Sequence, residues 1–380
     1  MQRISVSNLK PGMIIAKNIF DINGKLLLGA GTVINNKIIR RMVMNKITAA
    51  YIRNPLTDLD DDWLKAAIEN VPQMISEETI VKSAGKIRHC FSDVCSSTKI
   101  DVDNIKQIAE SILEEILDNC DAMINLGKIN IYDNDTFIHS ANVAALTAIM
   151  GTKMGYGRKQ LLELTIGAIL HDVGKLLIPV EILTKPDKLT SEEFEIIKRH
   201  PGIGFEILRK NKALPLLSAH VAYQHHEQYN GKGYGRAIKG ERIHKYARLV
   251  SVIDVYDALT SDRHYRKAFL PHEAYEIMMT MSANFDQQIL FLFLNQLTIY
   301  PVGITVELSN GATGIVERIL PGLQIRPTVR VISEKVGAFL REKSYSLDLS
   351  QNLNVTITKV LSEEEICQLM FPGTLGEKLF

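Results

Sequence analysis

The middle of the chain carries apolar residues at helical spacing almost without interruption, whereas both ends alternate short apolar runs with turn residues. Between residues 131 and 298 this periodicity predicts a series of helices. Thr190 and Glu193 form a capping-box pattern at the start of one helix, which we expect to end near His200. The predicted helices span residues 135–154, 159–171, 190–200, 214–226, 246–261, 272–281 and 286–297.

Residues 1–53 predict a small mixed α/β module. Asn23-Gly24 lies between apolar runs and is a hairpin signal. Residues 54–130 predict connecting helices, of which 102–117 is the clearest because Ile105, Ile108 and Ile112 form an apolar stripe. That stripe can pack in a dimer or on its own chain. The elements expected in the first module are strands at 13–16, 25–28 and 49–52 and a helix over 36–44.

Residues 299–380 return to strands and turns, with a second hairpin signal at Asn310-Gly311. The whole pattern predicts a mostly α protein. Its central helical domain, 131–298, is flanked by a small N-terminal α/β module and a small C-terminal β module. The strands expected in the last module are 304–308, 314–317, 327–332 and 355–358.

Composition is that of an ordinary globular protein: 46% of the 380 residues are hydrophobic and 23% are charged. The formal net charge of +1 argues against a nucleic acid polymer as a partner held by overall charge. The four cysteines form no CxxC pair, which favours reduced thiols. The start lacks the apolar core of a signal peptide, and the most apolar run, 289–299, is too short to span a membrane. We therefore expect a cytoplasmic protein.

Candidate chemistry begins with Ile169-Leu-His-Asp-Val-Gly-Lys175, which follows an apolar helical run. His171 and Asp172 bring a ring nitrogen and two carboxylate oxygens to one place, and an Asp carboxylate can bridge two metals. Lys175 adds a positive charge where a phosphate could sit. Alone, such a pair is more often a surface or capping pair, so the prediction depends on further ligands.

Four other predicted helices carry such residues. Asp135 and His139 share one helix face, and His200 ends another helix. The pair His225-His226 precedes a glycine-rich loop. Asp254 lies inside an apolar helix, where an unpaired carboxylate is costly.

Each of these residues also has an ordinary explanation. His225-His226 can cap helix carbonyls, and Asp254 can pair with Arg248 or Arg263. Jointly, however, they predict a shared metal centre. Ligands without thiolate favour iron or manganese over a structural zinc. Two or more such metals would clamp a phosphodiester for in-line attack by a bridging hydroxide.

The loop 229–236 combines glycines with basic side chains, which suits a phosphate, although most such loops are plain connectors. Arg263 and Arg266 follow Asp254 and Asp257 and can bind phosphates in bidentate fashion; solvated salt bridges are the alternative.

With these motifs in place, residues 135–297 resemble the HD-GYP subgroup of the HD-domain phosphohydrolases. The resemblance implies an all-helical domain around a two- or three-metal centre that hydrolyses cyclic di-GMP to pGpG or GMP. The matching strings are His139-Ser140, His171-Asp-Val-Gly-Lys175, Ile178-Pro179, Ile182-Leu-Thr-Lys-Pro186, Arg199-His-Pro-Gly202, His225-His-Glu227, Gly231-Lys-Gly-Tyr234 and Asp254-Val-Tyr-Asp-Ala-Leu-Thr-Ser-Asp-Arg263.

The resemblance also implies roles for single residues. Asp172, Lys175 and Asp257 would be catalytic, with the last two beside the scissile phosphate. Asp135 stands where some members carry a Glu that recruits a third metal. Substrate would be bound by Lys175, Tyr234, Arg263 and Arg266. The implied metal ligands are His139, His171, Asp172, His200, His225, His226 and Asp254.

The sequence departs from the subgroup at its namesake motif, with Asn230 where Asp is usual and Gly235 where Pro is usual. Loss of the proline is expected to free the loop. Three functions are therefore weighed: a cyclic di-GMP phosphodiesterase, a catalytically weak cyclic di-GMP receptor or scaffold, and an HD phosphohydrolase acting on another nucleotide or cyclic dinucleotide. A homodimer or a regulatory protein partner is open.

Overall fold

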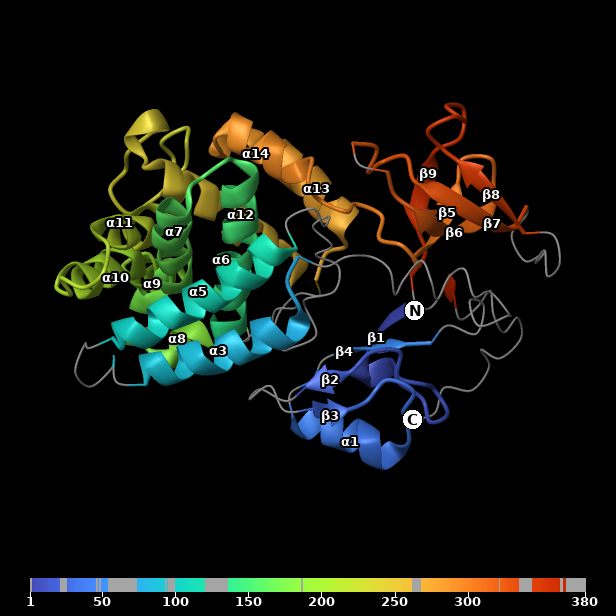
Figure 1. Ribbon diagram of the computed structural model, residues 1–380, viewed down its shortest axis with the longest axis horizontal. Helices are drawn as coiled ribbons and strands as arrows, with labels where there is room; N and C mark the ends of the chain where they lie inside the picture. Colours follow the sequence, from blue (N-terminus) through green and yellow to red (C-terminus); the bar gives the residue numbers. More distant parts are fainter. Residues whose placement is uncertain are drawn as a thin grey trace.

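The chain folds into a body of helices flanked by two small β-containing units (Figure 1). The N-terminal unit, drawn in blue, shares one hydrophobic core with the helices, whereas the C-terminal sheet, drawn in red, has a core of its own. The predicted mostly α fold with terminal α/β and β modules is confirmed. The computed structural model describes residues 2–20, 26–45, 47, 49–53, 74–92, 94, 100–119, 136–185, 187–261, 268–320, 322–334, 344–362 and 365–366.

The N-terminal unit contains two antiparallel strand pairs, β1 with β4 and β2 with β3. Its helix begins where the Asn35 side chain accepts a hydrogen bond from the Ile38 N–H at 2.9 Å. The predicted turn at Asn23-Gly24 lies outside the described residues, between β2 and β3. The elements are β1 (Gln2–Ser5), η1 (Val6–Asn8), β2 (Ile19–Phe20), β3 (Leu26–Leu28), α1 (Asn36–Met44) and β4 (Ala49–Ile52).

The helical body extends from α3 to α14. None of its described helices combines the length and the apolar character needed to cross a lipid bilayer. The elements are α3 (Glu77–Phe91), α5 (Val102–Asp118), α6 (Thr136–Lys153), α7 (Arg158–Leu170), η3 (Val173–Leu177), α8 (Val180–Leu183), α9 (Ser191–Ile197), α10 (His200–Arg209), α11 (Leu216–Gln224), η4 (Gly240–Arg242), α12 (Lys245–Thr260), α13 (Pro271–Thr280), η5 (Ser282–Asn284) and α14 (Gln287–Leu294).

Helix α6 lies at the centre of this body. It is buried around its circumference, as expected for a helix that is apolar on all faces, and α3, α5, α7 and α12 pack against it. Ile105, Ile112 and Ile116 of α5 are fully buried within the chain. Of the two arrangements left open for this stripe, packing on its own chain is the one observed. Thus α3 and α5, predicted to connect modules, also build the core around α6.

The helix predicted to end near His200 is α9, which ends at Ile197, and a further helix that was not predicted, α10, begins at His200. Proline has no N–H and is tolerated in the first turn of a helix, so Pro201 starts α10 and does not merely stop α9. The predicted capping box is confirmed: Glu193 N–H donates to Thr190 Oγ1 at 3.2 Å, and Thr190 N–H donates to Glu193 Oε2 at 2.7 Å.

The C-terminal unit is a five-stranded antiparallel sheet with the order β8-β7-β6-β5-β9. β5 and β6 form the hairpin predicted at Asn310-Gly311, and Gly311 has a φ of 82°. β8 was not predicted, because this edge strand is only four residues long and carries only two apolar residues, Tyr345 and Leu347. The strands are β5 (Thr305–Leu308), β6 (Thr313–Arg318), β7 (Thr328–Ser333), β8 (Tyr345–Asp348) and β9 (Ile357–Val360).

Candidate metal centre

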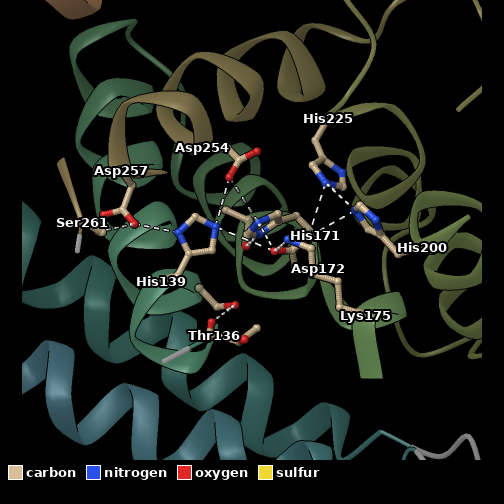
Figure 2. Close-up of polar contacts among 12 residues, drawn as sticks. Thr136, His139, His171, Asp172, Lys175, His200, His225, Asp254, Asp257 and Ser261 are labelled. Carbon is tan, nitrogen blue, oxygen red and sulfur yellow. Dashed lines mark hydrogen bonds and ion pairs between the residues drawn. The ribbon is translucent and has the colours of Figure 1, made fainter. Parts of the chain in front are cut away.

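Five helices direct histidines and carboxylates toward one another inside the helical body (Figure 2). The predicted ligands within the described residues all meet there, and they come from α6 (His139), the end of α7 (His171 and Asp172), the start of α10 (His200), the end of α11 (His225 and His226) and α12 (Asp254).

Asp172 lies between two groups of histidines, as Figure 2 shows. Its Oδ2 is 3.3 Å from Nε2 of His171 and 3.8 Å from Nε2 of His139. Its Oδ1 is 3.3 Å from Nε2 of His200 and 3.5 Å from Nε2 of His225. One carboxylate therefore presents a separate oxygen to each half of the site.

Asp254 faces the same histidines from α12. Its Oδ1 lies 3.0 Å from Nε2 of His139, and its Oδ2 lies 4.0 Å from Nδ1 of His226. Of the two ordinary ion-pair partners considered for Asp254, Arg248 instead pairs with Asp286 at 2.6 Å, and Arg263 lies outside the described residues. Asp254 therefore belongs to the histidine cluster.

The ligand-type atoms form two groups that can each hold a metal ion, and within each group they all lie within 4.8 Å of one another. The two groups are adjacent, because Asp172 of the first also approaches His139 and His171 of the second. The first group contains Asp172, His200, His225 and His226, and the second contains His139, His171 and Asp254.

Three of the histidines are held by the carbonyl three residues earlier in the chain. His171 Nδ1 lies 2.7 Å from Ala168 O, and His225 Nδ1 lies 2.9 Å from Ala222 O. His200 Nδ1 makes the same contact with the Ile197 carbonyl at 2.7 Å. Since a carbonyl only accepts, Nδ1 must carry the proton and Nε2 keeps its lone pair for a metal. Carbonyl capping and ligation by His225 are thus compatible.

His139 is held differently, between two carboxylates. Its Nδ1 lies 2.6 Å from Oδ2 of Asp257, and its Nε2 faces Asp254. Burial lowers the pKa of His139, but hydrogen bonds to Asp254 and Asp257 outweigh burial and raise it to about 9. Without a metal, this ring is therefore a cation at neutral pH.

Asp172, His225 and His226 are in the states that metal ligands require. Although burial raises the pKa of Asp172, the charges of Lys175 and His171 hold it well below its usual value. Burial lowers the pKa of His225 to about 4 and also depresses that of His226. The carboxylate is ionised and these two rings are neutral.

Two buried atoms at the centre are left without hydrogen bonds. In the described part of the chain, Nε2 of His171 and Oδ1 of Asp172 are among the few buried side-chain atoms that have no hydrogen-bond partner. Buried polar groups are normally satisfied, and exceptions call for an explanation. A metal between the imidazoles and carboxylates would satisfy both atoms, so these residues fit divalent metals.

The loop after α11 folds back over this cluster. Tyr234 stacks on His226, with ring centroids 4.7 Å apart and an interplanar angle of 27°. Burial and the charges of Asp254 and Asp172 raise the pKa of Tyr234, so its phenol keeps its proton. Lys175 Nζ lies 2.5 Å from Oδ2 of Asp172. A phenol O–H and an ammonium group thus flank the carboxylates.

Not every predicted site residue can be placed. Asp135, Arg263 and Arg266 lie outside the described residues. Asp257, expected beside the scissile phosphate, contacts the Nδ1 of His139 that points away from the other ligands. Glu227 was noted only as part of a motif, and its buried carboxylate anchors the loop that carries Tyr234. A carboxylate before a glycine-rich loop was the only signal for that role.

Comparison with known families gives two matches. Residues 112–289 match the HD domain, and residues 305–369 match a KOW domain associated with HD domains. The first match begins inside α5, within the segment 54–130 expected to connect modules. The second match covers the C-terminal sheet from β5 onward.

Curated proteins similar to this chain include two named as cyclic di-GMP phosphodiesterases. PA4108 of Pseudomonas aeruginosa is 34% identical over 226 residues, which cover 60% of this chain and 55% of that protein. PdeB of Borreliella burgdorferi is 26% identical over 351 residues, covering 83% and 89%. The 3'3'-cGAMP-specific phosphodiesterase 3 of Vibrio cholerae is 34% identical over 140 residues, covering 37% and 30%. The chain thus spans about half the length of PA4108 but most of PdeB.

Among solved structures, Bd1817, an HDG"Y"P protein from Bdellovibrio bacteriovorus, aligns with a TM-score of 0.49 and 21% sequence identity, covering 77% of this chain and 98% of that one. The HD-domain match spans every described member of the histidine and carboxylate cluster. Residues 112–289 therefore form an HD domain, and the motifs within them are those of the HD-GYP subgroup.

Proposed function

We propose that this protein is a metal-dependent phosphodiesterase that hydrolyses cyclic di-GMP to pGpG, GMP or both. The observation that carries the proposal is the position of Asp172, whose two oxygens face separate groups of histidines 3.3 Å away at His171 and His200. Two adjacent metal sites joined by one carboxylate suit in-line displacement at phosphorus. The names of the relatives PA4108 and PdeB support cyclic di-GMP as the substrate.

The proposed cofactors are two or three divalent metals, iron or manganese. One would be held by Asp172, His200, His225 and His226, and the next by His139, His171 and Asp254. A third would use Asp135. When bound, such metals would polarise the phosphodiester and activate the attacking water. Imidazole and carboxylate donors without thiolate suit these metals.

The chain's own residues would bind and orient the phosphate. Lys175, one quarter exposed and held by Asp172, would place its ammonium against a phosphate oxygen. Tyr234, which stays protonated, would donate its O–H to the substrate. Arg263 and Arg266 would bind the ligand's phosphates or guanines, as the resemblance to HD-GYP proteins implies.

Asp257 has a different place in this proposal from the one expected from sequence. Because its carboxylate accepts from Nδ1 of His139, we assign it the role of orienting that ligand. The proposal keeps the division of the chain that the sequence pattern predicts, into units at 1–53, 54–130, 131–298 and 299–380. It also keeps the cytoplasmic location expected from the sequence.

Two alternatives have specific support. The altered motif, with Asn230 and Gly235, favours a cyclic di-GMP receptor or scaffold with weak catalysis. The Vibrio cholerae relative named for 3'3'-cGAMP favours a related cyclic dinucleotide as the substrate. In either case the terminal modules would act on a regulatory partner or on a second copy of the chain.

The test is to purify the protein with iron or with manganese, measure metal per chain, and follow cyclic di-GMP and 3'3'-cGAMP by chromatography. We expect cyclic di-GMP to be consumed by the loaded protein and not by Asp172→Ala. Asp118→Ala removes an exposed carboxylate at the end of α5 and is the matched control.

Each alternative predicts a different result. Tight binding of cyclic di-GMP without product, at full metal content, would replace the phosphodiesterase with the receptor. Turnover of 3'3'-cGAMP alone would reassign the substrate. A wild-type protein that takes up no metal would contradict the proposed centre.

A further inference from the structure

Glu227 is a buried carboxylate that no cation neutralises by direct contact. Only 2% of the residue is exposed, and no salt bridge reaches it within the described part of the chain. Its carboxylate instead accepts backbone hydrogen bonds, from the N–H of Arg236 and from the N–H of Ile238 at 3.1 Å. A buried charge held only by backbone N–H groups fixes the segment that supplies them.

The segment that supplies these N–H groups begins at Gly235, and its backbone there has a conformation that only glycine adopts readily. Gly235 has a φ of +124°. A Cβ there would lie 2.7 Å from the Tyr223 carbonyl oxygen and 3.3 Å from Oε1 of Glu227. Proline, usual at this position in the subgroup, has a φ near about −65° and cannot adopt this conformation. The absence of proline was expected to free the loop. Instead, Gly235 lets the backbone approach the Glu227 carboxylate, which holds the loop in place.

The opposite end of the loop is also fixed. Tyr229 N–H donates to the Asn284 carbonyl at 2.7 Å, and Asn230 Nδ2 donates to Asn284 Oδ1 at 2.8 Å. Between the two anchors, Tyr234 N–H donates to the His226 carbonyl at 3.1 Å while its ring stacks on the His226 imidazole. The loop thus holds Tyr234 in one place above a candidate metal ligand.

We propose that Glu227 is a positioning residue, which together with Gly235 holds the loop so that Tyr234 stays against His226 and faces the substrate. Glu227 touches neither the substrate nor the metals, and acts through Tyr234. The inference rests on the proposed function for its kinetic consequence, but its geometric part can be measured without any turnover.

The first measurement is amide hydrogen exchange of the metal-loaded full chain. In Glu227→Gln one carboxylate oxygen becomes an NH₂ group, which cannot accept a hydrogen bond. We expect the amide of Arg236 or Ile238 to exchange at least about tenfold faster, because local opening becomes easier. Glu241→Gln makes the same chemical change at an exposed carboxylate in η4 and should leave both amides unchanged.

The second measurement separates a positioning role from a general structural one. At unchanged metal content, Glu227→Gln should raise KM for cyclic di-GMP by roughly tenfold or more, with a smaller effect on kcat. If Glu227 acts through Tyr234, its effect should largely disappear in a Tyr234→Ala background, since coupled residues give non-additive effects. Should Glu227→Gln fail to fold, Gly235→Ala introduces a Cβ that meets the Tyr223 carbonyl oxygen and crowds the Glu227 carboxylate, and it should give the same exchange pattern.

Unchanged exchange at both Arg236 and Ile238 would overturn the proposed anchor. Additive effects of Glu227→Gln and Tyr234→Ala, or metal loss in Glu227→Gln, would overturn the route through Tyr234. If the wild type turns over no cyclic di-GMP, the proposed function has failed. In that case the exchange result and the affinity for cyclic di-GMP still decide the role of Glu227.

Discussion

His139 and Asp257 are joined by a 2.6 Å hydrogen bond between Nδ1 of the ring and Oδ2 of the carboxylate. Ser261 Oγ approaches the same oxygen at 3.4 Å. Because Nδ1 is engaged, Nε2 of His139 is turned toward Asp254, 3.0 Å away. Contacts of this kind orient a ligand histidine and raise its basicity. Asp257 is therefore placed to orient His139 in the proposed metal centre.

This relationship predicts that Asp257→Ala weakens metal binding. Loss of such a partner commonly costs about 10–100-fold in affinity or activity, so we expect a decrease of that size in manganese affinity. The measurement is a manganese titration of the metal-free protein, with the exposed Asp187→Ala as the control. Full affinity combined with lost turnover would instead return Asp257 to the scissile phosphate, as the family resemblance implied.

The raised pKa of His139 predicts that protons and metal compete. In the metal-free protein this pKa is about 9, against an ordinary value of 6.5. The protonated ring thus stabilises the metal-free fold fully below about pH 6.5, and this stabilisation is lost as the pH rises through about 9. Metal binding must displace the proton, so manganese affinity should rise with pH up to about 9, by about tenfold per unit.

Titrations with manganese at pH 7 and pH 8 test this competition. Asp257→Asn removes one of the two charges that hold the proton, so its affinity should depend less on pH in this range. Equal affinity of the wild type at the two pH values would show that no proton leaves on binding.

The convergence of the candidate ligands was predictable from sequence because ligand chemistry is carried by residue type. Imidazoles and carboxylates without thiolate on five helices had one joint explanation, and His139, His200 and Asp254 do converge. Helix boundaries with local signals were also predictable, as the capping box of Thr190 and Glu193 confirms.

The rest of the site could not be predicted from sequence, because it depends on contacts between segments that are distant in the chain. No local pattern shows that Glu227 binds the N–H of Ile238, or that Asp257 pairs with a histidine 118 residues earlier. Pro201 misled the prediction at His200 because proline disfavours helix in the residue before it, yet here α10 begins at His200 with Pro201 in its first turn. β8 was missed because Tyr345 and Leu347 are its only apolar residues, too few to form a pattern.

Lys175 predicts a separation of metal binding from catalysis. Its ammonium lies 2.5 Å from Oδ2 of Asp172 but supplies no ligand atom. Lys175→Met keeps the aliphatic stem and removes the charge, so metal per chain should stay the same. Loss of one preorganised charge at a reacting phosphate should lower kcat by about 10²–10³-fold. Lys188→Met, at an exposed lysine, is the control, and loss of metal from Lys175→Met would contradict this separation.

The close backbone contact at Gly174 predicts that the distance between Asp172 and His200 depends on this glycine. A Cβ at this position would lie 2.0 Å from the His200 carbonyl oxygen and 2.7 Å from the Gly204 nitrogen. Neither atom can move without shifting the start of α10, so Gly174→Ala should destabilise the fold by about 1–3 kcal/mol. The same shift would carry His200 away from Asp172 and weaken metal binding.

Thermal unfolding and metal content of Gly174→Ala are compared with those of Gly202→Ala. Gly202 lies within α10, where a Cβ would meet no atom within 4 Å. Alanine is favoured over glycine inside a helix by roughly 0.5–1 kcal/mol, so this control should be slightly more stable than wild type and should bind metal normally. If both variants unfold like the wild type, Gly174 does not hold η3 against α10, and another contact must set the distance between Asp172 and His200.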